Sequence, residues 1–98
     1  MALTHIAFCQ VGFTKNGCSV PAPDGETAVS EGITPSGSNQ QSAAADKPMA
    51  RVATDTAVYV AIGASPDATT TTGRFFMPAN TVEYFQIEIG NKVAVVTI

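Results

Sequence analysis

Short runs of β-branched residues, each ended by a turn signal, are the feature that most restricts how this chain folds. The sequence has one leucine, Leu3, against ten valines, six isoleucines and twelve threonines. β-Branched side chains have few χ1 rotamers and pack well on a pleated sheet, whereas they are weak helix formers. The sequence therefore predicts an all-β fold.

The clearest runs lie in the second half of the chain. Val58, Val60 and Ile62 alternate with polar or small residues, so they fall on one face of a strand. Other runs have the same character. The expected strands there are residues 49–54, 56–62, 74–77, 81–89 and 92–98.

Turn signals separate these runs. Residues 63–73 contain a proline, an aspartate and two glycines, which predicts a long turn, and Gly90-Asn91 predicts a tight hairpin between the last two strands. Turns at intervals of roughly 8–12 residues indicate a small antiparallel β-sandwich or a jelly-roll-like barrel. At 98 residues the chain has room for a single domain, residues 1–98.

The first part of the chain is harder to assign. Residues 3–13 form an expected strand with two largely apolar faces, which suits either a central strand or an arm laid on a neighbouring subunit. For the arm, residues 1–13, we expect inter-subunit contacts at Leu3, Ile6, Phe8, Val11 and Phe13. Residues 16–32 have loop signals, with a short strand at 27–29, and the Ser- and Gln-rich residues 34–46 predict a surface crossing or flexible connection.

The charge content restricts the partners. Charged residues make up 13% of the chain, against about 25% in average soluble proteins, and the net charge is −3. The five basic residues are scattered, so no nucleic-acid partner is expected. No apolar stretch is long enough to span a membrane. A surface so poor in charge favours a subunit that contacts other subunits and forms a homo-oligomer; the alternative is a monomer with a threonine-rich surface.

The residues that carry chemistry are isolated in the sequence. His5 is the single histidine, and Cys9 and Cys18 have the wrong spacing for a zinc site. The start lacks a secretory signal, so reduced thiols are expected, although the spacing leaves a Cys9–Cys18 disulfide open. Asp24 and Glu26 share a loop without calcium-site spacing around them. We therefore expect no catalytic residues, no metal site and no cofactor, and hence no enzyme.

Three segments carry a resemblance to a known class of proteins. They are SGSNQQSAA at residues 36–44, RVATDTAVYVAIGASPDATT at 51–70 and MPANTVEYFQIEIGNKVAVV at 77–96. In this order, from residue 33 onward, the sequence resembles small bacteriophage virion proteins of the capsid decoration, or cement, type. The resemblance implies a non-enzymatic subunit of the virion, assembled in the host cytoplasm and bound to the major capsid protein or other virion subunits.

Two alternative functions remain open at this point. One is a neck, tail or fibre-base subunit, which the same resemblance allows. The other is a carbohydrate-binding β module that uses Tyr59, Tyr84 or Phe76 as a stacking surface.

Overall fold

The computed structural model of this chain describes residues 3–9, 11–13, 21–23 and 29–98, with side chains at 3–9 and 29–98. These residues contain strands and turns and no helix, which confirms the all-β prediction. The strands are β1 (Thr4–Cys9), β2 (Val11–Phe13), β3 (Pro21–Pro23), β4 (Val29–Ile33), β5 (Gln40–Gln41), β6 (Met49–Thr54), β7 (Val58–Gly63), β8 (Arg74–Met77), β9 (Thr81–Gln86) and β10 (Lys92–Thr97).

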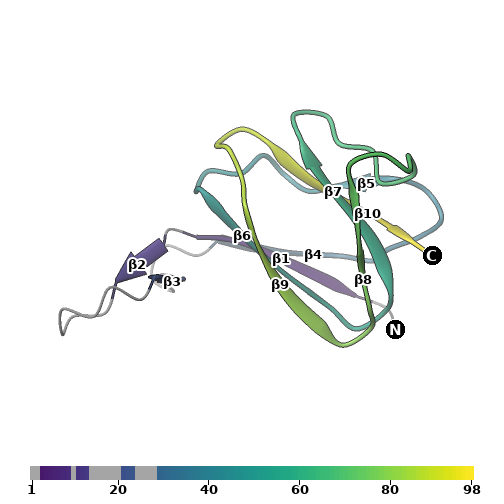
Figure 1. The fold of residues 1–98 in the computed structure, drawn as a ribbon, viewed down its shortest axis with the longest axis horizontal. Helices are drawn as coiled ribbons and strands as arrows, with labels where there is room; N and C mark the ends of the chain where they lie inside the picture. The colour runs from purple at the N-terminus through teal and green to yellow at the C-terminus, as the bar shows by residue number, and fades with distance from the viewer. Residues whose placement is uncertain (1–2, 10, 14–20, 24–28) are drawn as a thin grey trace.

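Two four-stranded antiparallel sheets pack face to face, as the sequence predicts for a β-sandwich (Figure 1). The first sheet has the order β4-β1-β6-β9 and the second has the order β5-β10-β7-β8. Within the two sheets, β7 and β8 are paired sequence neighbours, whereas the chain crosses between the sheets after β4, β5, β6, β8 and β9. The edge strands β8 and β9 therefore follow one another in the chain but belong to different sheets.

The predicted hairpin at Gly90-Asn91 is wrong, because β9 and β10 lie in different sheets. The turn itself is present, with Gly90 at a φ of 97°, a conformation that glycine adopts without steric cost. The predicted strand 81–89 also ends earlier, at Gln86. Ile87 enters the core and its N–H donates to the Pro48 carbonyl at 3.0 Å, so Ile89 is left exposed on the crossing to the second sheet.

The core lies between the sheets and is built mainly from alternate residues of their strands. Ile6 and Val52 contribute from the first sheet, and Val60, Val95 and Met77 contribute from the second. A buried hydrogen bond of 3.0 Å joins the hydroxyl groups of Thr4 and Thr54 at one end of this layer. The alternation that the sequence shows is thus the alternation between the inner and outer sides of each sheet.

Residues 34–46 lie along an edge of the sandwich, and the expected flexible connection is instead hydrogen-bonded to its neighbours. β5 pairs with β10, and the Ser42 N–H donates to the Val93 carbonyl at 2.7 Å while the Val93 N–H donates to the Ser42 hydroxyl at 2.9 Å. Further along, the Ala45 N–H donates to the Asn91 carbonyl at 2.7 Å. Polar side chains in this segment therefore complete backbone pairing at the side of β10.

The first part of the chain forms two antiparallel strand pairs, β1 with β4 and β2 with β3. β1 lies between β4 and β6 in the first sheet, and β4 replaces the last four residues of the loop predicted over residues 16–32. Beyond β1, strands β2 and β3 pair as a two-stranded ribbon that lies outside the sandwich in Figure 1. We call residues 11–13 and 21–23 the β2–β3 ribbon.

Candidate docking face

The structure places two of the five predicted contact residues inside the domain. Ile6 and Phe8 are 0% and 3% exposed and belong to the main hydrophobic core. β1 is paired on both sides, and its inner face packs against the second sheet of the same chain. The prediction of inter-subunit contacts is therefore wrong for Ile6 and Phe8. Leu3 is half-buried on the outer side, and the side chains of Val11 and Phe13 lie outside the described residues.

The other residues singled out from the sequence form no reactive cluster where the structure describes them. His5 is exposed on the outer side of β1, Cys9 is buried, and Cys18 lies outside the described residues. Asp24 and Glu26 also lie outside them. Within the described part of the chain, no three histidine, cysteine or acidic side chains come together as metal ligands.

The outer face of the second sheet is covered by the chain itself. Residues 64–72, between β7 and β8, fold back over this face and bury Ala68, which is 0% exposed. Ala68 packs with Ala61, Ala94 and Val96 of the sheet, forming a second hydrophobic cluster. The small side chains of this face allow the loop backbone to approach closely.

Polar side chains hold this loop in place. The Asn39 side chain donates to the Pro66 carbonyl at 3.1 Å and accepts from the Ala68 N–H at 2.8 Å. Gln41 also donates to the Pro66 carbonyl, at 3.0 Å, and the Arg74 guanidinium donates to the Ala68 carbonyl at 3.3 Å. Four hydrogen bonds therefore tie the loop to the sheet beneath it.

The aromatic residues considered for sugar stacking do not share one surface. The Arg74 guanidinium lies over the Tyr59 ring at 3.6 Å from its centre, and Phe76 contacts the same ring edge-on at 5.9 Å between centroids. These three residues are on the second sheet, whereas Tyr84 is on the outer side of the first sheet. Tyr59 already has a cation stacked on it, so it is not an open platform for a sugar ring.

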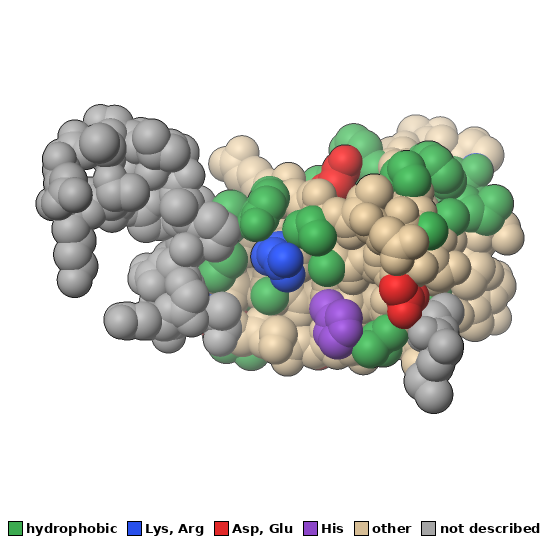
Figure 2. Space-filling view, turned by 90° about the horizontal axis from the view of Figure 1, so that it is seen from below, with side chains coloured by type: hydrophobic (Ala, Val, Ile, Leu, Met, Phe, Trp, Pro, Cys, Tyr) green, Lys and Arg blue, Asp and Glu red, His purple; other side chains and the backbone are tan. Residues whose placement is uncertain are grey.

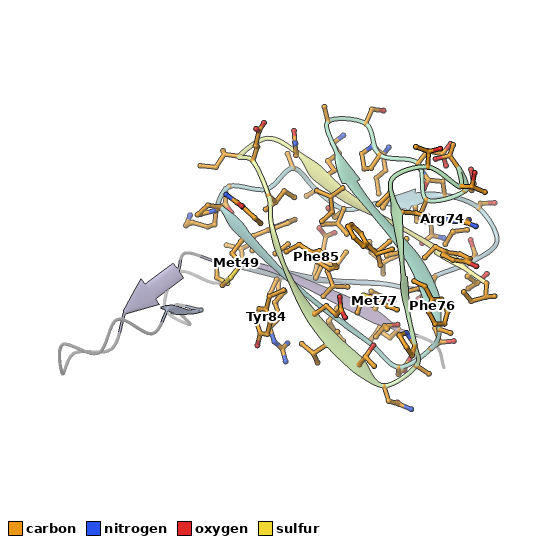
Figure 3. All side chains as sticks on the ribbon, viewed as in Figure 1. Met49, Arg74, Phe76, Met77, Tyr84 and Phe85 are labelled. Carbon is orange, nitrogen blue, oxygen red and sulfur yellow. The ribbon has the colours of Figure 1, made fainter. Side chains whose placement is uncertain are left out.

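The outer face of the first sheet has a different character, and we call it the docking face. In register across β1, β6 and β9, Ala7 lies beside Arg51 and Arg51 beside Tyr84. Figure 3 shows Tyr84 and Phe85 on opposite sides of β9, with Phe85 toward the second sheet. The docking face consists of Leu3, His5, Ala7, Met49, Arg51, Ala53, Val82, Tyr84 and Gln86.

Figure 2 shows this face, with the histidine and a basic side chain set among hydrophobic groups. Among the described residues, the ion pair that the structure contains is Lys47–Asp46, at 3.4 Å, so Arg51 has no carboxylate partner there. Arg51 is half-buried and offers five N–H donors in a planar fork that matches a carboxylate. The electrostatics of this face therefore suit a partner that presents an acidic group within an apolar surface.

Two shallow depressions lie at opposite ends of the docking face. One, of about 310 Å³, is lined by residues that include Leu3, His5, Asp55 and Val82. The other, of about 300 Å³, lies beside Tyr84 and is completed by Pro48, Met49, Phe85 and Gln86. Both are open and apolar, so they suit side chains of a docked surface better than a small polar ligand.

The residue types on the docking face are those enriched in protein interfaces. Tyrosine, methionine and arginine are over-represented in interface cores and hot spots, whereas lysine, glutamate and aspartate are depleted. Met49, Arg51 and Tyr84 meet across β6 and β9. None of the three was predicted as an inter-subunit contact, and Tyr84 was considered only for sugar stacking, because register between distant strands decides that they are neighbours. In the sequence, the available signal was that these three residues alternate with residues expected to face the core.

Comparison of this chain with protein-family models, with curated proteins and with solved structures finds no match. Within the described residues, no helix is long and apolar enough to cross a bilayer.

Proposed function

We propose that this chain is a non-enzymatic structural subunit of a bacteriophage particle, which docks on the capsid through the docking face and stabilises the shell. The observation that carries the proposal is the cluster of Met49, Arg51 and Tyr84, over which no described loop lies, on a sandwich whose other outer face is covered. The resemblance of residues 33–98 to small virion proteins supports the same conclusion. A subunit that binds the assembled shell but not its free components stabilises that shell by mass action.

The composition also supports a docking role. Few charges have to lose their hydration when a neighbour covers this face, and Arg51 is the one cation among the residues that define it. Tyr84 is 53% exposed, so contact with a shell would remove a large aromatic surface from water. We therefore expect Tyr84 and Arg51 to dominate the affinity.

The first experiment is to count copies of this chain in purified particles by quantitative mass spectrometry. A shell-decorating subunit is expected in on the order of hundreds of copies, whereas a neck or tail ring would contain about five to twelve. The lower number would contradict capsid decoration and favour the neck, tail or fibre-base alternative. The absence of the chain from particles would contradict both.

The second experiment tests the docking face itself. Arg51→Glu is expected to weaken binding to undecorated heads by about tenfold or more, because it places an acidic group against an acidic partner. Lys92→Glu is the matched control, because Lys92 is also half-buried but projects from the outer side of the second sheet. Equal losses for the two variants, measured by co-sedimentation, would contradict the docking face.

A second matched pair removes the aromatic surface. Tyr84→Ala is expected to weaken binding to the heads, whereas Phe76→Ala, at a residue that is 54% exposed on the second sheet, should leave binding within about twofold of wild type. The opposite ranking would assign docking to the second sheet instead.

A further inference from the structure

The β2–β3 ribbon has no third strand in the described part of its own chain. Its register runs from Val11 opposite Pro23 to Phe13 opposite Pro21. A two-stranded ribbon by itself is at best marginally stable in water and gains stability when another strand or an apolar surface covers it. Figure 1 shows the ribbon beyond the end of β1 and away from β9. It therefore lacks a covering strand from its own sandwich.

The sandwich presents an open edge at β8 and β9. Each of these strands pairs with one neighbour among the described strands, so its other side offers unpaired backbone groups. Phe75 of β8 points between the sheets and meets Phe85 of β9 at 5.4 Å between centroids, yet it remains half-exposed. Val82 and Tyr84 are also exposed along β9. This edge has both the backbone template and the apolar flank that an added strand requires.

The opposite edge of the sandwich, at β4 and β5, is occupied by the chain itself. The Glu31 carboxylate on β4 accepts a hydrogen bond from the Ala43 N–H at 2.8 Å. The following residues run beside β10, as the Ala45 and Asn91 hydrogen bond shows. A ribbon is therefore better accommodated at β9 than at β4.

In the sequence, the segment from Val11 to Pro23 and the strand β9 carry opposite formal charges. From Val11 to Pro23 the sequence carries one formal charge, the positive charge of Lys15. β9 likewise carries one, the negative charge of Glu83. Glu83 has no ion-pair partner among the described residues. A segment with a single positive formal charge in the sequence is therefore an electrostatically suitable partner for this edge in a second copy.

We propose that the β2–β3 ribbon of one copy adds to the free edge of β9 in a second copy of this chain. This contact goes beyond docking on a shell, because it joins copies to one another when no shell is present. The donor and acceptor surfaces are different parts of the molecule, so the contact is heterologous. It links copies into an open chain or a ring, or into a closed dimer when two copies exchange ribbons.

The test is sedimentation velocity of the full chain over a range of concentrations. Wild type should show an average mass that rises above the 10.1 kDa of one chain. Replacing residues 9–28 by Asn-Gly joins Phe8 directly to its partner Val29 through a two-residue turn and removes the ribbon. This variant should stay monomeric. A wild-type chain that is monomeric at every concentration, or a ribbon-free chain that assembles like wild type, would overturn the proposal.

Charge exchange tests the contact without removing any segment. Glu83→Lys should raise the dissociation constant about threefold or more, and the double variant Lys15→Glu/Glu83→Lys should return it toward the wild-type value. Glu88→Lys, beyond the end of β9, is the matched control and should have no effect. A double variant as weak as Glu83→Lys would overturn the proposed pairing. These samples contain no shell, so a negative result leaves docking through Arg51 to be judged by its own experiment.

Discussion

The two outer faces of this sandwich differ in whether the chain completes them. The face of the second sheet is lined by small residues such as Ala61 and Ala94, and residues 64–72 cover it. The docking face has larger side chains, including Met49, Arg51 and Tyr84, and the described residues place no loop over them. A sheet face that carries interface-type residues, and over which no described loop lies, has the properties that the proposed docking requires.

The two faces also differ in whether their polar side chains find hydrogen-bond acceptors within the described part of the chain. Beside the second sheet, the Asn39 and Arg74 side chains donate hydrogen bonds to carbonyl groups of the loop, so these polar side chains stabilise the fold. On the first sheet, the Arg51 donors have no acceptor among the described residues. Side chains of similar chemistry thus stabilise the monomer on one face and are available for recognition on the other.

The strongest way to break this comparison is to make the same substitution on both faces. Ala68→Leu should lower the free energy of unfolding by about 2 kcal/mol, because a larger side chain beneath the loop overpacks a filled site. Ala53→Leu, on the docking face, should change it by about 0.5 kcal/mol or less. Urea unfolding of both variants measures the contrast. Equal effects would mean that residues 64–72 do not cover the second sheet.

A smaller change in the free energy of unfolding is expected when the hydrogen bonds between Asn39 and residues 64–72 are altered. Asn39→Asp keeps the oxygen that accepts from the Ala68 N–H but removes the donor to the Pro66 carbonyl, so it should cost about 1 kcal/mol. The control is Asn91→Asp, because the Asn91 side chain makes no hydrogen bond within the described residues. Unfolding midpoints that shift equally in the two variants would show that the Asn39 bridge contributes nothing specific.

The smallest expected effect concerns pH. Hydrogen bonds from the side chain and then the backbone of Thr69 lower the pKa of Asp67 below its ordinary value of 3.8. A lowered folded-state pKa contributes stability that is present above the ordinary pKa and is lost as the pH falls from about 4 through the lowered pKa. Thr69→Ala should move the Asp67 pKa back toward its ordinary value in an NMR titration. An unchanged pKa would show that Thr69 does not stabilise the carboxylate.

Much of the fold could be predicted from local pattern. The alternation of Val58 and Val60 with Tyr59, and the turn signals of residues 63–73, identify β7, β8 and the loop between them, because inward and outward positions differ in a two-residue period. The β-branched composition likewise predicts the sandwich. These features depend on neighbours in sequence, which a single chain displays directly.

Features that depend on long-range pairing could not be predicted. Ile6 and Phe8 resemble contact residues in sequence, but β4 and β6 pair on either side of β1 and turn both side chains into the core. The Gly90-Asn91 turn has hairpin composition, yet the chain leaves the first sheet after Ile87 and pairs next in the second sheet. The candidate site was missed for the same reason, since Arg51 and Tyr84 become neighbours only through the pairing of β6 with β9.

Hydroxyl-radical footprinting of the chain, free and bound to purified heads, tests the docking face most directly. Met49 and Tyr84 should lose reactivity on binding, whereas Phe76, with an exposed fraction close to that of Tyr84, should keep it. Protection of Phe76 with Met49 and Tyr84 still reactive would contradict the assignment of docking to the first sheet.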